Sequence, residues 1–153
     1  MDLRIEAIGV ANRRLLEGMA VAPGQENNIE TIECCMSEAE RNHAWRPVVI
    51  LAGGLPAGFA MYGFFADEGS FGRVWLDRLM VDQNFQGHGI GSAALNAMID
   101  RLVEEYGCNE IYLSVYESNT RAISMYKRRG FEFNGELDAK GELVMVLKTD
   151  NNA

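Results

Sequence analysis

Residues 72–107 constrain the fold of this chain most, because a strand, a glycine-rich turn and a helix follow one another there without a gap. The first part, "GRVWLDRLMVD" (72–82), is rich in residues that favour β-strands. The middle part, "NFQGHGIGSAAL" (84–95), contains three glycines at alternate positions. The last part, "SAALNAMIDRLVEEYG" (92–107), has apolar residues at helical spacing and a glycine at its end. The unit therefore predicts a helix that packs on a sheet.

The rest of the chain supplies the other elements of that sheet. Alternating or continuous apolar runs predict further strands over 3–8, 47–54, 57–65, 110–116, 131–137 and 142–148. Helical spacing predicts further helices over 12–21, 26–43 and 119–130. The predicted order is β α α β β β α β α β β, an α/β class with a mixed sheet and helices on its faces. No repeat, low-complexity block or linker divides the 153 residues, so we expect one domain over 1–153.

The charge balance and the rare residues exclude several classes of protein. The net charge of −8 disfavours nucleic acid as a partner. It makes a cationic partner easier to attract, and the alternative is that the acidity only aids solubility. Three cysteines, two of them adjacent, suit neither a disulfide framework nor a zinc site, so we expect a cytoplasmic protein. Two histidines are too few for a histidine-rich site, and no metal is expected. We also expect no signal peptide and no membrane segment, because no apolar run approaches the roughly 20 residues that a span requires.

The glycine-rich turn has the chemical properties that an anion-binding site requires. The first amides of a helix lack internal partners and carry the positive end of its dipole, and glycines allow a phosphate to approach them closely. A P-loop would need a lysine after its last glycine, and "GIGSAA" has none. The spacing G-x-G-x-G also differs from the G-x-G-x-x-G of dinucleotide-binding folds. A phosphate cradle and a tight turn without a ligand both remain open on this stretch alone.

Two ordered segments resemble the GCN5-related N-acetyltransferase (GNAT) superfamily. Gln86, Gly89 and Gly91 fit its Q/R-x-x-G-x-G/A pattern between a strand and a long helix. Downstream, "SVYESNTRAISMYKRRGF" (114–131) is similar to the second segment of the family. The stretches "GRVWLDRLMVD", "FAMYG" and "FNGELDAKGELVMV" further resemble the bacterial spermine/spermidine acetyltransferase branch. The resemblance implies acetyl-coenzyme A (acetyl-CoA) as donor and a primary amine of a polyamine as acceptor.

The resemblance also implies a coenzyme site. The backbone amides of the turn would bind the pyrophosphate, and the edge of the preceding strand would pair with the pantetheine arm, as an added strand would. In the family this strand diverges from the strand at 110–116 and leaves a V-shaped slot. The residues that the resemblance assigns to the coenzyme are Leu79, Met80, Val81, Gln86, Gly87, His88, Gly89, Ile90, Gly91, Ser92, Asn119 and Ala122. Many relatives form dimers, which suggests a homodimer.

Two residues are candidates for the proton transfers of such a reaction. An alkylammonium has a pKa near 10.4 and must lose a proton before it attacks, and the departing thiolate benefits from a proton donor. Tyr126 matches the general acid of the family; the alternative is a buried tyrosine that only packs its helix on the sheet. Asp77 lies inside a predicted strand, where a carboxylate is costly unless it has a role. It is a candidate base or amine ligand, and the alternative is an ion pair with Arg73 or Arg78.

Recognition of the amine is the least constrained part of the prediction. Glu26, Glu30 and Glu33 share one face of a predicted helix and could hold the distal amines of a polyamine together with Asp77. The alternative is an ordinary solvated helix face. Two other functions stay open: acetylation of another cationic amine, such as an aminoglycoside or a peptide amine, and a catalytically silent sensor of coenzyme A.

Overall fold

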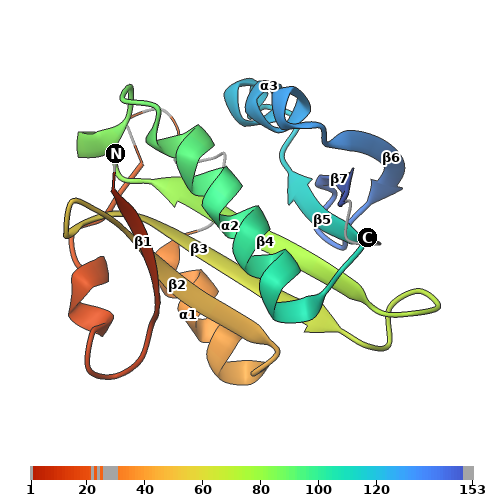
Figure 1. Cartoon of the computed structure of the whole chain (residues 1–153), viewed down its shortest axis with the longest axis horizontal. Coiled ribbons are helices and arrows are strands. Elements are labelled where there is room, and N and C mark those ends of the chain that lie inside the picture. The colour runs from red at the N-terminus through yellow and green to blue at the C-terminus, as the bar shows by residue number, and fades with distance from the viewer. Residues whose placement is uncertain (1, 22, 24, 26–30, 150–153) are drawn as a thin grey trace.

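A seven-stranded mixed sheet forms the framework of the described part of the chain (Figure 1). The computed structural model describes residues 2–21, 23, 25 and 31–149. Its elements in chain order are β1 (Leu3–Ala7), η1 (Arg13–Leu16), α1 (Ile32–Arg41), β2 (Trp45–Ala52), β3 (Leu55–Phe65), β4 (Arg73–Val81), η3 (Gln83–Phe85), α2 (Ile90–Tyr106), β5 (Glu110–Val115), α3 (Thr120–Arg129), β6 (Glu132–Leu137) and β7 (Leu143–Lys148). The strands lie in the order β1-β2-β3-β4-β5-β7-β6. The mixed sheet and the predicted order of elements are confirmed, except that a 3-10 turn takes the place of the first predicted helix.

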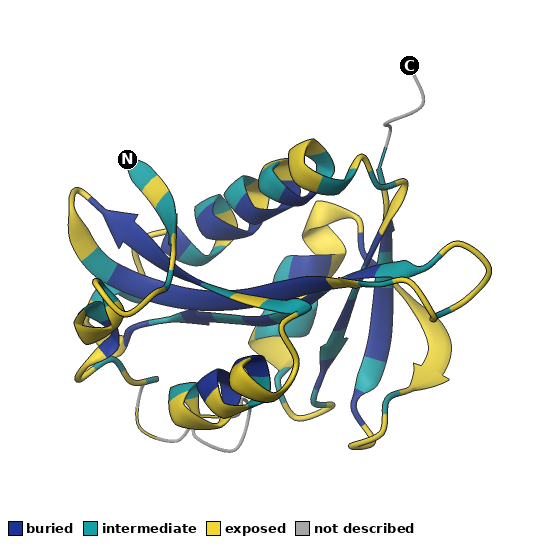
Figure 2. Ribbon diagram, turned by 90° about the horizontal axis from the view of Figure 1, so that it is seen from below, coloured by how far each residue is buried: buried dark blue, intermediate teal, exposed yellow. Residues whose placement is uncertain are grey.

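Helices cover both faces of the sheet (Figure 2). On one face, apolar residues of α2 and α3 pack with β3, β4, β5 and β7 in the largest core cluster, which includes Leu95, Leu102 and Phe131. On the other face, α1 and η1 pack on β2 and β3 around Phe59 and Met61. The strands in the middle of the sheet are therefore buried on both sides, which explains why β2 and β3 read as nearly continuous apolar runs.

Two predicted helices differ from the structure. The helix expected over 12–21 is only a four-residue 3-10 turn, because Glu17 is extended and Gly18 has a φ of 77°. The helix expected over 26–43 is α1, which begins after Thr31; the side chain of Thr31 accepts a hydrogen bond from the amide of Cys34 at 3.1 Å. The preceding residues 26–30 lie outside the described residues.

Strand β4 contains an irregularity that matters for the site. Met61 pairs with Arg78 but the next residue, Tyr62, pairs with Leu76, so Asp77 is the extra residue of a β-bulge. A bulge locally bends its strand and changes the direction of the side chain it carries. Buried and partly buried residues nevertheless alternate regularly from Arg73 to Val81, so periodicity in the sequence does not reveal the bulge.

Candidate active site

The site is built where β4 and β5 separate. These parallel strands pair only at Val74↔Ile111 and Trp75↔Tyr112. From Leu76 to Val81, β4 continues to pair with β3 but has no register partner on β5. The V-shaped slot implied by the family resemblance is therefore present in the sheet.

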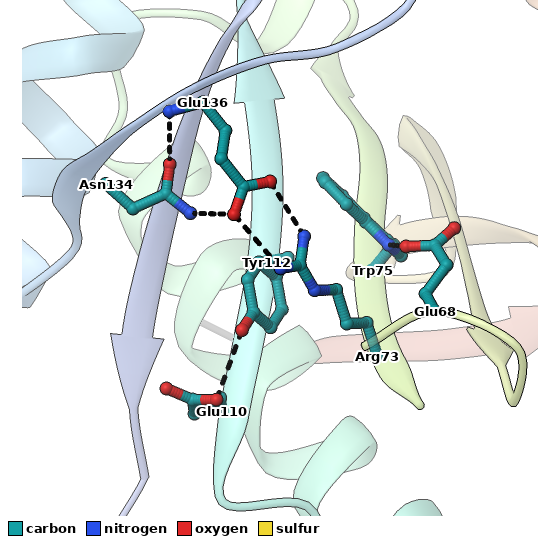
Figure 3. Close-up of polar contacts among 7 residues, drawn as sticks. All are labelled: Glu68, Arg73, Trp75, Glu110, Tyr112, Asn134 and Glu136. Carbon is teal, nitrogen blue, oxygen red and sulfur yellow. Dashed lines mark hydrogen bonds and ion pairs between the residues drawn. The ribbon is translucent and has the colours of Figure 1, made fainter. Parts of the chain in front are cut away.

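The paired end of this slot is fastened by a polar cluster (Figure 3). Arg73 of β4 makes a two-pronged ion pair with Glu136 of β6 at 2.8 and 3.0 Å, and its guanidinium lies 4.3 Å from the ring centre of Tyr112 on β5. Trp75 stacks near the same ring at 5.4 Å and donates to Glu68 at 2.7 Å. Arg73 therefore links β4, β5 and β6 at the paired end of the slot, and its ion pair is with Glu136 and not with Asp77.

The glycine-rich turn leads from the open end of β4 into α2. Gly87 and Gly89 have φ of 84° and 75°, a region that side chains other than glycine adopt rarely, and a Cβ at either position would meet no atom within 4 Å. Gly89 is the N-cap of α2 and, lacking a side chain, makes no side-chain capping bond. The turn thus presents bare backbone at the N-terminus of a 17-residue helix, which suits an anion.

A cavity of about 420 Å³ lies between this turn, the open end of β4 and the first turns of α3. All of the coenzyme residues predicted from the sequence line it except His88, which is exposed on the turn. Other residues of α3 also line the cavity and were not predicted from the sequence: Thr120, Arg121, Met125 and Arg128. Of these, Arg121 and Arg128 are the most informative, since two cations beside an anion site add attraction for phosphate. The sequence signal that could have identified them is the presence of basic residues at regular spacing in α3.

Side chains near the turn hold it in place. Gln86 donates from Nε2 to the carbonyl of Val81 and to Oε1 of Gln25, each at 3.1 Å. The carboxylate of Asp82 is buried and accepts from the amides of Ala20 at 2.9 Å and of Asn84 at 3.3 Å. These contacts tie the end of β4 to the segment before α1. Gln86 therefore positions the turn as well as lining the cavity.

A small cavity of about 30 Å³ adjoins the large one, and the two share Leu79 and Asn119. Its volume is about that of one water molecule. It is lined by Asp77, Arg78, Leu79, Ser114, Val115, Asn119, Tyr126 and Glu142. Both residues that the sequence predicted for catalysis, Tyr126 and Asp77, are therefore brought together between the separated strands.

Asp77 is ion-paired in this cavity. Its Oδ1 lies 3.0 Å from Nη1 of Arg78, and the two side chains are 12% and 5% exposed. Arg78 also donates to the backbone carbonyl of Asp77 at 2.9 Å. The ion-pair alternative raised by the sequence is thus realised with Arg78, and the charge of Asp77 is balanced within the site.

Tyr126 is buried on α3, with its ring 5.8 Å from that of Phe131. Burial raises the pKa of its phenol to about 12, with the Arg78 charge lowering it and the Glu142 charge raising it. The hydroxyl consequently keeps its proton throughout the neutral and moderately alkaline range. A phenol in that state can donate a proton or hydrogen bond but is a poor base.

Glu142 is an ionisable residue of this cavity that was not predicted from the sequence. It lies directly before β7, is 3% exposed, and its Oε2 is buried without a hydrogen-bond partner among the described residues. Burial raises the pKa of its carboxyl to about 7; the Arg78 charge opposes this rise, and Asp138 and Asp77 add to it. A glutamate in a turn near the end of a chain gave no signal, because only the packing of β7 against β5 buries it.

The acidic helix face predicted for amine binding is only partly described. Glu26 and Glu30 lie outside the described residues. Glu33 is exposed in the first turn of α1 and lines a different cavity, between η1 and α1, which does not include Asp77. The described residues therefore do not place Glu33 and Asp77 in one pocket.

Known acetyltransferases share both this sequence pattern and this fold. The family model described as "Acetyltransferase (GNAT) family" matches residues 13–131. The spermine/spermidine N(1)-acetyltransferase of Bacillus subtilis (strain 168) is 43% identical over 149 residues, which cover 95% of this chain and 98% of that relative. The chain therefore belongs to the GNAT family and is an acetyl-CoA-dependent N-acetyltransferase.

Solved structures show the same fold at lower sequence identity. The aminoglycoside acetyltransferase AAC(6')-Ib, in complex with paromomycin and acetyl-CoA, is 17% identical, with a TM-score of 0.79 over 99% of this chain and 96% of that one. The spermidine N-acetyltransferase of Vibrio cholerae, in complex with CoA and spermine, is 18% identical, with a TM-score of 0.68 over 94% of this chain and 92% of that one. These likenesses establish the fold.

Two further findings concern the described residues alone. No three of their His, Cys, Asp and Glu side chains are grouped so as to hold a metal ion. None of their helices is long and apolar enough to cross a membrane.

Proposed function

We propose that this chain transfers acetyl from acetyl-CoA to a primary amine of spermidine or spermine. The observation that carries the proposal is that two cavities lie side by side where β4 and β5 separate, with Leu79 and Asn119 lining both. One has a bare-backbone anion site, and the other has two carboxylates and a protonated phenol. The 43% identity to the Bacillus subtilis spermine/spermidine enzyme supports the choice of acceptor.

In the proposed complex, the coenzyme enters by the larger cavity. The amides from Gly87 to Ser92 hold the pyrophosphate, with Arg121 and Arg128 facing it from α3. The pantetheine arm lies along Leu79–Val81, where β4 has lost its neighbour, and Asn119 and Ala122 contact it from α3. This places the thioester beside the small cavity, because Leu79 and Asn119 line both spaces. His88, exposed on the turn, could reach only the phosphate groups.

The small cavity would then hold the reacting groups. The amine nitrogen attacks the thioester carbon, the C–N bond forms, and the C–S bond breaks. Tyr126 is the proposed acid, since its protonated hydroxyl can supply the proton that the departing sulfur requires. Asp77 is close enough to the same space to attract an ammonium group, although Arg78 already balances its charge.

Acceptance of a polycation is supported by the charge of the chain and by an acid on α1. The net charge is −8, and Glu33 is exposed in the first turn of the helix, whereas Glu38 and Glu40 are ion-paired with Lys140 and Arg13. We keep Glu26, Glu30 and Glu33 as proposed ligands of the distal amines. Glu33 would act there from the neighbouring cavity and not from the reaction centre.

An amine panel tests the choice of acceptor. Release of free coenzyme A would be measured with spermidine, spermine, an aminoglycoside and a short peptide with a free amino group, each over a range of concentrations. We expect spermidine and spermine to have kcat/KM values at least about tenfold above the others, which corresponds to about 1.4 kcal/mol of discrimination. Turnover of another amine with no turnover of either polyamine would overturn the acceptor. Binding of acetyl-CoA without turnover of any amine would favour the silent sensor.

A change at Gly89 tests the proposed pyrophosphate site. We expect Gly89→Ala to raise the KM for acetyl-CoA by about tenfold, because a side chain is strained at a φ of 75° and the amides would shift from their positions at the helix start. Gly135→Ala is the matched control: Gly135 has a φ of 87°, and a Cβ there also meets nothing within 4 Å, but it lies on β6 away from the cavity. Both variants should lose similar thermal stability. Equal KM values for the two variants would remove the turn from the coenzyme site.

Oligomeric state and location also rest on the family likeness. A homodimer and a cytoplasmic location stay predictions. Light scattering at several protein concentrations would measure the mass in solution.

A further inference from the structure

Glu142 is a buried carboxyl in the reaction cavity with an oxygen that no described group satisfies. The side chain is 3% exposed, and its Oε2 is buried without a hydrogen-bond partner among the described residues. It lines the cavity of about 30 Å³ together with Tyr126 and Asp77. A buried acceptor without a partner is costly, and such groups are found where a ligand, a water or a proton completes them.

We propose that Glu142 accepts the proton that the substrate ammonium must lose before it attacks the thioester. The transfer runs directly or through the single water molecule that the cavity has room for. This proposal deepens the proposed function and depends on it. The geometry assigns the role of base to the β7 side of the slot and leaves Asp77, on the β4 side, as an amine ligand.

The comparison with Asp77 favours Glu142. Oδ1 of Asp77 is 3.0 Å from Nη1 of Arg78, and the same Nη1 donates to the carbonyl of Asp77 at 2.9 Å. Asp77 is therefore engaged with an arginine that is itself 5% exposed and fixed in the site. Glu142 lines the same cavity but, among the described residues, has no ion pair with an arginine.

The ionisable groups around Glu142 influence its pKa, which matters for the role of base. Asp77 and Arg78 face it from β4, Tyr126 from α3, and Asp138 from the turn between β6 and β7. Burial, the largest effect, raises the pKa of Glu142 to about 7, and the negative charges add to the rise while Arg78 opposes it. A base is most useful when its pKa lies near the operating pH. At neutral pH a large share of Glu142 is ionised and ready to take a proton, and it is a stronger base than an ordinary carboxylate.

The turn that carries Glu142 is held rigidly. Oδ1 of Asp138 accepts hydrogen bonds from the amides of Lys140 at 2.9 Å and of Glu142 at 2.8 Å, and Nζ of Lys140 lies 3.3 Å from Glu38 on α1. Burial raises the pKa of Asp138, but the hydrogen bonds from Glu142, Lys140 and Ser114 outweigh it and lower that pKa overall. Asp138 therefore stays ionised and shares a side-chain hydrogen bond with Glu142, which can hold the proton once it has been accepted.

The proton balance of the reaction is complete with these groups. The ammonium gives a proton to Glu142, which becomes neutral, and the free amine attacks the thioester carbon. As the C–S bond breaks, Tyr126 gives its proton to the sulfur. The phenolate then takes the remaining extra proton from the new amide nitrogen, and Glu142 releases its proton to solvent. The net products are the N-acetylated amine, free coenzyme A and one proton.

The pH dependence of kcat/KM tests the proposal, measured from pH 5.5 to pH 9.5 with the best amine of the panel. For the unaltered enzyme, we expect an acid limb with its midpoint near the pKa of about 7 given for Glu142. Glu142→Gln should lower kcat/KM at pH 8 by about a hundredfold and abolish the limb, leaving a rate that rises tenfold per pH unit with the free amine. Glu142→Asp should restore part of the rate. Asp77→Asn should keep the limb but move its midpoint to lower pH, because the negative charge of Asp77 contributes to the raised pKa of Glu142.

Thermal unfolding separates this role from damage to the fold. Folding raises the pKa of Glu142 from 4.5 to about 7, so its contribution to stability is present below pH 4.5 and lost as the pH rises through 7. Glu142→Gln should therefore melt no lower than the unaltered enzyme at pH 5.5 and higher at pH 8.5. A less active variant that is also more stable cannot be explained by misfolding.

The outcomes separate the two proposals. An acid limb and rate that survive in Glu142→Gln overturn the role of Glu142 but leave the acetyltransferase intact. If Asp77→Asn loses the acid limb of the kcat/KM profile and Glu142→Gln keeps it, the base is Asp77 and not Glu142. Failure of every amine in the panel overturns the proposed function and this proposal with it.

Discussion

Tyr126→Phe is expected to lower kcat by about a hundredfold or more while leaving the KM for acetyl-CoA within about twofold, because general acids contribute roughly 10²- to 10⁴-fold. The substitution removes one hydroxyl from a side chain that is 8% exposed and keeps the ring that packs 5.8 Å from Phe131. The departing thiolate then lacks its proton donor, whereas the coenzyme keeps its binding contacts. Initial rates over a matrix of acetyl-CoA and spermidine concentrations would separate kcat from both KM values.

Tyr62→Phe is the matched control for this change. Tyr62 is 1% exposed, and its hydroxyl donates to Glu105 at 3.0 Å and accepts from Arg101 at 3.1 Å, outside both cavities of the site. The control should lose about 1 kcal/mol of stability with its hydrogen bonds but keep kcat per folded molecule. Equal turnover by Tyr126→Phe and the unaltered enzyme would show that Tyr126 only packs α3 on the sheet.

The pKa of Tyr126 also predicts the alkaline behaviour of the enzyme. With that pKa raised to about 12 by burial, the phenol keeps its proton to well above pH 10. The rate should therefore not fall through ionisation of Tyr126 over the range in which the amine becomes free base.

Arg78→Met is expected to have the largest effect on stability, about 3–5 kcal/mol, because it leaves buried carboxylates without their cation. For a chain of this length, that loss lowers Tm by roughly 10 °C. Arg78 is 5% exposed, lies 3.0 Å from Asp77, and lowers the pKa of Glu142 from across the small cavity. The free energy of unfolding from urea titrations, with Tm from calorimetry, would measure the effect.

The loss should also depend on pH. Without Arg78 the pKa of Glu142 rises further above its value of about 7, so the charge-driven part of the loss is present at pH 8 and shrinks as the carboxyl is protonated towards pH 5.5. Arg73→Met is the control: it also breaks an ion pair of β4, but Arg73 and Glu136 are 24% and 44% exposed, and such pairs contribute about 1 kcal/mol or less. If both variants lost the same stability at both pH values, Arg78 would not be the cation that balances the buried acids.

Local patterns in the sequence were sufficient for most of the architecture. The glycine-rich turn, its flanking strand and the long helix α2 were predicted within a few residues of their bounds. The mixed sheet was predicted as well, because apolar periodicity and glycine positions depend on near neighbours in the chain. The helix expected over 12–21 is wrong because its apolar spacing does not distinguish a helix from a short turn. One 3-10 turn is enough to place Leu16 in the core beside α1, which is a tertiary contact that local spacing does not reveal.

The residues of the site also fall into two groups, those that local sequence motifs predicted and those that only tertiary contacts bring together. The residues of the larger cavity that come from the end of β4 and the glycine-rich turn follow motifs that are continuous in sequence, so the sequence alone was enough to propose them as a coenzyme site. Arg121 and Arg128 of the same cavity were not found in that way. The reaction cavity depends on contacts between segments far apart in the chain. β4 and β5 separate after two pairs, Asp77 lies at a bulge of β4 and is ion-paired with Arg78, and β7 lies against β5 so that Glu142 is buried and lines the same cavity as Tyr126. Burial and opposing charge determine the protonation of such groups, and both arise only when the chain has folded.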